Sequence, residues 1–172
     1  KLCQSYFKQY QSNFISLMPN NLYGPNDNFN LDTSHVIPAL IRKFHEAKVL
    51  SKDEVSIWGT GKPKRELVHV DDFASAMIFT MKNIDANEVY DNGISHINVS
   101  SGEEMSIKEL ALLIKNIVGF QGALTFDHSM PDGTPRKLLD GTFLNKVNWT
   151  SKIRLENGLR SLYSWYIENQ SK

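Results

Sequence analysis

Apolar residues follow a helical period in several long segments of the chain. In residues 1–12, Leu2, Tyr6 and Tyr10 are spaced four apart, which places them on one face of a helix. The same spacing predicts further helices over residues 37–47, from about residue 73 onward, over residues 107–118 and over residues 155–168. The last helix is expected to bury Leu155, Leu159, Leu162, Tyr163 and Tyr166.

Short apolar runs between these helices have the length of β-strands. They cover residues 14–18, 55–58, 67–70, 96–100 and 124–126. Strands that alternate with helices favour an α/β fold with parallel pairing. The first run ends in a polar loop, and ligands bind open α/β sheets at such strand ends.

Polar residues at the predicted helix starts can cap the free backbone N–H groups. Ser34 is the expected cap of the second helix, and either Asp71 or Asp72 that of the third. Ser106 and Glu109 have the spacing of a capping box, which predicts a helix start at this position.

The charge balance and the single cysteine narrow the class of protein. Nineteen basic and nineteen acidic side chains cancel among 172 residues, which argues against binding along a nucleic-acid backbone. No apolar run approaches the ~20 residues that a membrane span needs. Cys3 has no partner for an internal disulfide, so we expect a reducing cytoplasm and a buried bystander thiol. The uncapped start at Lys1 leads us to expect a truncated chain with one small domain and part of another.

Three polar residues near the first strand end are candidates for acid–base chemistry. Asn20, Asn21 and His35 can face one cleft, and a neutral imidazole can both take and donate a proton. Taken alone, a histidine at a helix start is more often only a polar surface residue. The other four histidines show no metal-ligand spacing with His35, so no metal site is expected.

Several cations are candidates for binding an anionic ligand. Arginine has a planar fork that matches phosphate oxygens, although a solvated charged surface is the simpler interpretation of these residues. Trp58 precedes a glycine turn and can stack on a nucleobase, whereas most such tryptophans lie in a core. The candidate cations are Lys43, Arg65, Arg136 and Lys137.

Five segments together make a family resemblance that extends over the whole chain. They are PNNLYGP at 19–25, SHVIPALI at 34–41, WGTG at 58–61, RELVHVDD at 65–72 and PDGTPRKLLD at 131–140. The chain resembles the GDP-L-fucose synthase family of extended short-chain dehydrogenase/reductases. The segments at 34–41 and 131–140 separate this family from other members of that group.

The resemblance implies the C-terminal part of a two-domain enzyme. Residues 1–34 would end a Rossmann domain that binds NADP, and residues 35–172 would mainly form a small α/β substrate-binding domain. Segments near 67–101 would return to the Rossmann sheet. The implied activity is 3,5-epimerisation and NADPH-dependent 4-reduction of GDP-4-keto-6-deoxy-D-mannose to GDP-L-fucose, by a homodimer in the cytoplasm.

The resemblance also implies roles for individual residues. His35 matches the family's catalytic acid in epimerisation and a cofactor-binding position. The matching cofactor-binding residues are Pro19, Asn20, Asn21, Leu22 and His35. The matching substrate-binding residues are Asn21, Lys43, Trp58, Arg65 and Asp132, and Lys137 is assigned to the diphosphate side.

The sequence departs from the family pattern in two ways. It lacks the glycine-rich phosphate loop, the catalytic Ser, the Tyr-x-x-x-Lys motif and the second epimerisation residue, a Cys. We therefore expect these upstream of Lys1, and expect this chain alone to be inactive. Arg154 stands where the family has a small hydroxyl residue before the last helix, which weakens the cap by about 1 kcal/mol.

Two other interpretations remain open at this point. The chain can belong to another nucleotide-sugar epimerase or dehydratase of the extended reductase group, or it can be a binding module for sugar nucleotides without catalysis. The segments at 34–41 and 131–140 weigh against the first alternative. A naturally complete chain that lacks the Rossmann half would favour the second.

Overall fold

A computed structural model describes residues 1–169 of the chain, which form seven helices and eight short strands within that range. The helices are α1 (Leu2–Tyr10), α2 (Val36–Val49), α3 (Val70–Asn83), α4 (Ala86–Tyr90), α5 (Ile107–Val118), α6 (Thr142–Lys146) and α7 (Leu155–Asn169). The strands are β1 (Leu17–Pro19), β2 (Asn21–Tyr23), β3 (Glu54–Trp58), β4 (Lys64–His69), β5 (Ile97–Val99), β6 (Glu104–Ser106), β7 (Ala123–Asp127) and β8 (Arg136–Lys137).

The strands pair mainly in parallel, as the alternation of strands and helices predicted. β1 pairs with β5, β2 with β4, and β3 with β7, all in parallel register. β4 continues into an antiparallel pair with β6 and a short parallel pair with β8. The α/β fold class is therefore confirmed.

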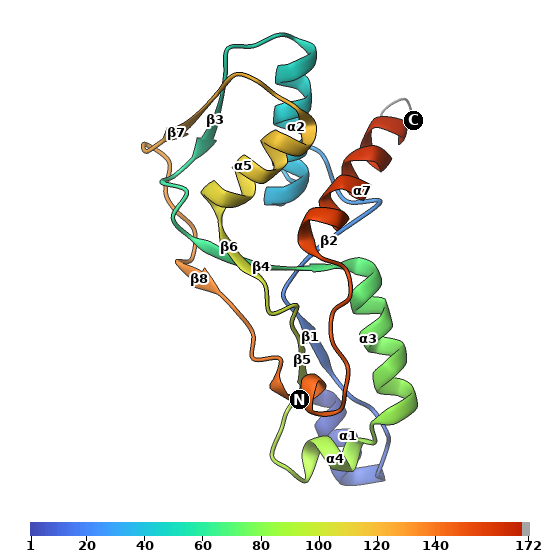
Figure 1. Cartoon of the computed structure of the whole chain (residues 1–172). Coiled ribbons are helices and arrows are strands. Elements are labelled where there is room, and N and C mark those ends of the chain that lie inside the picture. The colour runs from blue at the N-terminus through green and yellow to red at the C-terminus, as the bar shows by residue number, and fades with distance from the viewer. Residues whose placement is uncertain (170–172) are drawn as a thin grey trace.

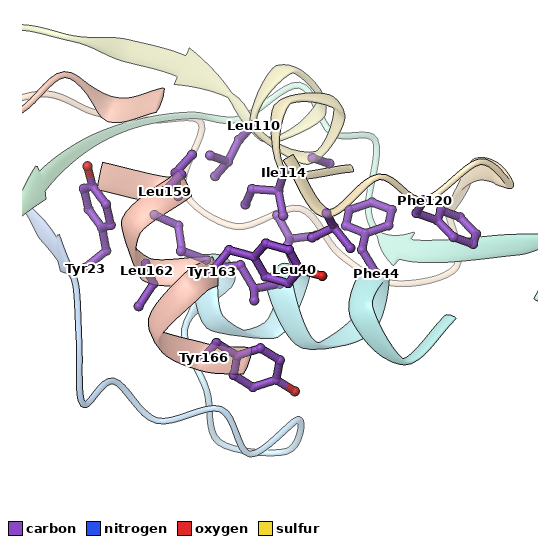
Figure 2. Close-up of a cluster of buried hydrophobic side chains, with 14 of the residues drawn as sticks. Tyr23, Leu40, Phe44, Leu110, Ile114, Phe120, Leu159, Leu162, Tyr163 and Tyr166 are labelled. Atoms are coloured by element: carbon purple, nitrogen blue, oxygen red, sulfur yellow. The ribbon is translucent and has the colours of Figure 1, made fainter. Parts of the chain in front are cut away.

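Two hydrophobic clusters lie at opposite ends of the molecule (Figure 1). At one end, α2, α5 and α7 pack together beside β3 and β7, and their side chains interdigitate around Phe44, Leu110 and Leu162 (Figure 2). At the other end, α1 and α4 lie near β1 and β5, with a core that includes Val89 and Trp149. β4 contributes to both clusters, because Leu67 belongs to one and its neighbour Val68 to the other; the cavity described below opens beside this strand.

The last helix buries the five predicted side chains, Leu155, Leu159, Leu162, Tyr163 and Tyr166. Arg154 precedes this helix, and the carboxylate of Glu103 accepts a hydrogen bond from the backbone N–H of Leu155 at 3.4 Å. A side chain from another segment therefore takes over part of the capping role that a local hydroxyl would have.

The capping box before α5 is confirmed. Ser106 Oγ accepts from the backbone N–H of Glu109 at 3.2 Å, and Glu109 Oε2 accepts from the N–H of Ser106 at 2.8 Å. Both orphan N–H groups are thereby satisfied, which fixes the point where β6 turns into the helix.

The predicted caps of α3 and α2 are both wrong. The N-cap of α3 is His69, whose Nδ1 accepts from Asp71 N at 3.2 Å, because the helix begins at Val70 and not near Phe73. Asp72 is buried, and its carboxylate accepts hydrogen bonds from Ser151 Oγ and from the backbone of the segment before α7. Long-range contacts of this kind cannot be inferred from spacing along the helix.

The cap of α2 is also different from the prediction. His35 occupies the N-cap position, and its side chain caps no N–H of the helix. Ser34 Oγ is buried and has no hydrogen-bond partner among residues 1–169. The first strand is also shifted from its predicted position at residues 14–18. β1 covers only Leu17–Pro19, the three residues that pair with β5.

Among residues 1–169, no helix is both long and apolar enough to cross a lipid bilayer.

Candidate functional site

A cavity of about 720 Å³ opens where β1 and β2 meet the N-terminal end of α2. Its lining joins the end of the first strand, the following loop, the first turn of α2 and part of β4. The structure therefore brings many of the predicted site residues into one space, as expected for the ends of parallel strands. The predicted residues that line it are Pro19, Asn20, Asn21, Leu22, His35, Arg65 and Lys137.

Two neighbouring amides form one wall of this cavity. Asn20 Nδ2 donates to Glu66 Oε2 at 2.7 Å and to the carbonyl oxygen of Lys137 at 3.2 Å. Asn20 Oδ1 accepts from the backbone N–H of Asn21 at 3.0 Å, and Asn21 Nδ2 donates to the carbonyl of Glu66 at 2.9 Å. The two side chains are held in fixed orientations, so they present a preorganised polar surface to a ligand.

Glu66 is a residue whose importance the sequence analysis missed. It lies in β4 with none of its surface exposed, and the following residues Leu67, Val68 and His69 are also buried. A buried carboxylate must be hydrogen-bonded to be tolerated. The available signal was an acidic residue that leads directly into a buried apolar run.

His35 lines the cavity from the N-terminal end of α2. Its backbone is extended, with φ −74° and ψ 171°, and its carbonyl accepts the N–H of Ala39 at 3.1 Å. The side chain is exposed and lines the same cavity as Asn20 and Asn21. This placement gives the imidazole access to a ligand in the cavity.

Lys43 and Trp58 line a separate, smaller cavity of about 210 Å³ beside the first one. The two cavities share Val36, and Lys43 Nζ lies 5.6 Å from the centroid of the Trp58 ring. Trp58 is 64% exposed, so its interpretation as a core residue is wrong. The exposed indole can stack on a flat ligand, and Ser34 lines the same space.

Asp132 lies outside both cavities and organises the turn between β3 and β4. Its carboxylate accepts from the backbone N–H of Thr60 at 2.8 Å and from Thr60 Oγ1 at 2.7 Å, and these hydrogen bonds lower the pKa of Asp132. Gly59 has φ 77°, and a Cβ there would lie 2.2 Å from Asp132 Oδ1. Glycine is therefore required for this close approach.

Arg65 and Lys137 provide positive charge along the cavity. Arg65 Nη1 donates to the carbonyl of Thr134 at 2.6 Å, which holds the 131–137 loop against β4. Arg136 is not available in the same way, because its guanidinium forms a two-pronged pair with Glu104 at 2.8 and 3.0 Å. Arg136 was predicted as a candidate for anion binding, but its guanidinium is already paired with this carboxylate.

The combined arrangement can bind an anionic ligand and exchange a proton with it. Two cations, two fixed amides and an exposed imidazole line the large cavity together. Among residues 1–169 no group of three or more His, Cys, Asp or Glu is placed to hold a metal ion. The chemistry that these side chains themselves can carry is proton transfer and anion binding.

Comparison with known proteins gives consistent matches over the whole chain. Residues 1–99 match the model of the NAD dependent epimerase/dehydratase family. The chain is 53% identical over 98% of its length to a probable GDP-L-fucose synthase 1 of Oryza sativa, and covers 49% of that protein. It is 51% identical over its full length to a GDP-L-fucose synthase of Escherichia coli, and covers 54% of that protein.

Solved structures give the same picture. A GDP-D-glycero-L-gluco-heptose synthase of Campylobacter jejuni, determined in the presence of NADPH, is 40% identical with a TM-score of 0.88. The match covers 96% of this chain and 57% of that one. The chain spans about half the length of the curated relatives it matches. On the family model and the shared fold, this chain belongs to the NAD dependent epimerase/dehydratase family.

Proposed function

We propose that this chain forms the substrate-binding part of an enzyme that makes GDP-L-fucose from GDP-4-keto-6-deoxy-D-mannose. The observation that carries the proposal is the large cavity, which brings His35 together with Asn20, Asn21 and the cations Arg65 and Lys137. The names and identities of the rice and Escherichia coli relatives support the same substrate. The activity is 3,5-epimerisation followed by NADPH-dependent reduction at C4.

The substrate would extend over both cavities. Arg65 and Lys137 would bind the diphosphate, because a guanidinium and an ammonium both pair with phosphate oxygens. Lys43 and Trp58 would contact the more distant part of the nucleotide from the smaller cavity. Asp132 would contribute indirectly, because its carboxylate holds the turn at Thr60 that follows Trp58.

His35 would return a proton during epimerisation. Removal of the proton from a carbon next to the 4-ketone leaves an enolate, and a proton given to the opposite face inverts that carbon. Removal of the first proton needs a second group, which acts as the base. The exposed imidazole that lines the cavity would donate the second proton.

The cavity also fits the reactive end of a nicotinamide cofactor. Pro19, Asn20, Asn21 and Leu22 line the cavity, with their amides held by hydrogen bonds, and they would hold NADPH beside His35. When bound, the cofactor supplies the hydride for reduction at C4. Residues 1–34 and the segments near 67–101 would form the cofactor side, and the remainder mainly the substrate side. The cluster near α1 and α4 supports this division, because most of its buried residues come from the cofactor-side segments, with Leu144 and Trp149 added from the remainder.

A grafted protein tests the proposal. The matched segment of the Escherichia coli relative is replaced by this chain, and NADPH oxidation is measured with GDP-4-keto-6-deoxy-D-mannose, with product identified by NMR. We expect GDP-L-fucose from the graft and background oxidation from the isolated chain. Turnover of another GDP-sugar in its place would favour a different reductase of the family, and nucleotide binding without turnover a non-catalytic module.

A further inference from the structure

One buried carboxylate connects the two walls of the large cavity. Glu66 Oε2 accepts from Asn20 Nδ2 at 2.7 Å and from the backbone N–H of Leu139 at 3.1 Å. Glu66 Oε1 accepts from the backbone N–H of Gly102 at 2.9 Å and from Ser100 Oγ. Four donors from three separate segments therefore converge on a side chain with no exposed surface.

The donors come from segments with different places in the site. Asn20 joins β1 to β2, on the side proposed to hold the cofactor, whereas Leu139 follows Lys137, on the side proposed to bind the diphosphate. Asn20 Nδ2 also donates to the carbonyl of Lys137 at 3.2 Å. A further amide, Asn98 Nδ2, donates to the carbonyl of Asp140 at 3.2 Å and holds the end of the same loop.

We propose that Glu66 is a positioning residue that sets the 137–140 loop and the Asn20–Asn21 pair in one joint arrangement. A diphosphate bound by Lys137 then acts through Leu139 and Glu66 on the orientation of Asn20. The assignment of the two walls to diphosphate and cofactor rests on the proposed function. The link between the walls rests on the hydrogen bonds of Glu66, beside the direct one from Asn20 to the carbonyl of Lys137.

The chemistry of the link requires a carboxylate. Glutamine has the same shape but offers one acceptor oxygen and one N–H₂ donor. If its nitrogen faces Asn20 and Leu139, two donors meet a third and the N–H of Leu139 loses its acceptor. If it faces the other way, the N–H of Gly102 keeps only Ser100 Oγ, at 3.1 Å, as an acceptor. In either orientation a backbone N–H loses its charged acceptor, and hydrogen bonds to charged groups contribute more than neutral ones.

The first test measures amide exchange in the 172-residue chain with Glu66→Gln. Exchange of the Leu139 or the Gly102 amide should accelerate about tenfold or more, because a hydrogen bond to a charged acceptor is lost. Exchange of the Ile114 amide, in the middle of α5, should stay the same. Glu54→Gln, which makes the same change at an exposed position on β3, is the matched control and should alter none of these rates.

Two results would overturn the role of Glu66. One is wild-type exchange at both Leu139 and Gly102 in folded Glu66→Gln protein, and the other is equal acceleration at Ile114, which would indicate general loss of stability. If Glu66→Gln does not fold, Asn20→Ala removes a single donor and leaves the carboxylate. It should accelerate exchange at Leu139 several-fold and leave Gly102 unchanged, and an unchanged Leu139 would equally refute the link.

The second test follows the link spectroscopically, with GDP as the probe. In the wild-type chain, added GDP should shift the side-chain amide resonances of Asn20 and Asn21. In Glu66→Gln the dissociation constant should rise about tenfold, and at saturating GDP these resonances should no longer respond. A response equal to that of wild type would show that the walls are not coupled through Glu66. A wild-type chain that does not bind GDP contradicts the proposed substrate, while the exchange test still decides the role of Glu66.

Discussion

At the scale of single residues, a substitution can probe the close contact between Gly158 and Tyr23. Tyr23 is 2% exposed and its burial raises the pKa of the phenol; a Cβ on Gly158 would lie 2.3 Å from its hydroxyl oxygen. Gly158→Ala gains about 1 kcal/mol of helix propensity but overpacks this contact by about 1–3 kcal/mol. We expect net destabilisation, measured by urea unfolding.

A second substitution identifies the cause of that effect. Tyr23→Phe removes the oxygen that the new methyl group would meet, so the double variant should recover most of the stability lost by Gly158→Ala. A double-mutant cycle without coupling energy would show that the hydroxyl is not the obstacle.

The role of His35 can be tested in the grafted protein with His35→Asn. Asparagine can still hydrogen-bond but cannot carry a proton near neutral pH, so deuterium incorporation from solvent at C3 and C5 should fall by ~10²–10⁴-fold. Direct reduction of the 4-keto sugar should survive in part, since hydride transfer does not use this proton. The matched control is His128→Asn, which changes an exposed loop histidine outside the cavity lining.

The outcomes of this experiment separate three roles for His35. Unchanged rates would mean that it is only a surface residue at a helix start. A parallel loss of both rates with a raised KM for NADPH would mean that it mainly holds the cofactor.

The residue scale also shows what the sequence could and could not predict about the site. Pro19 to Leu22, His35, Arg65 and Lys137 were predicted from a resemblance, and the structure brings them to one cavity. Glu66 could not be identified, because its partners lie 34 to 73 residues away along the chain. Such contacts follow from the fold and leave no local pattern.

At the scale of elements, the attachment of β8 should depend on pH. The hydrogen bonds from Arg136 lower the pKa of the Glu104 carboxyl, with a smaller contribution from Lys64. Because the folded-state pKa lies below the ordinary value of about 4.3, this pair is fully present above that value. It is lost as the pH falls through the lowered folded-state pKa.

The Arg136 Nε–H resonance and the exchange of neighbouring amides should report this loss between about pH 5 and pH 2. Glu104→Gln should show the released state already at pH 7, and should no longer change with acid. A transition of the same size in Glu104→Gln would mean that another group controls β8.

Elements differ in how far the sequence predicts them. Helices α2, α5 and α7 were predicted because each carries a long apolar stripe that it buries against the others (Figure 2). The short elements β6, β8 and α6 were not predicted, since two to five residues give no period. The helix starts at α2 and α3 were wrong because His35 and His69 occupy positions where hydroxyl or carboxylate caps are more common.

At the scale of the whole molecule, the end that carries α1 exposes a group of aromatic side chains. Leu2 is 72% exposed, Tyr10 62% and Phe14 53%, and the Tyr6 ring lies 5.6 Å from Tyr10 and 6.0 Å from Phe14. β1, in the same half, pairs with β5 along one edge. Exposed apolar surface and open strand edges both promote association.

We therefore expect the isolated chain to bind a hydrophobic dye and to associate as its concentration rises, as measured by light scattering. Substituting Tyr10 and Phe14 with serine should reduce both signals, whereas Trp58→Ser, at the other end, should not reduce association. A monodisperse chain that causes no increase in the fluorescence of the dye at any concentration would contradict this expectation.

The parallel pairing of distant strands also determines how quickly the chain can reach this structure. Leu17 meets Ile97, Asn21 meets Leu67, and Glu54 meets Ala123, so each pair forms only after a long segment between them has been closed into a loop. Loop closure costs entropy before any strand contact can repay it, and folding rates fall as the separation of contacting residues grows. The helices can form early, while the cavity, which depends on β2 and β4 lying side by side, is completed among the last and slowest steps.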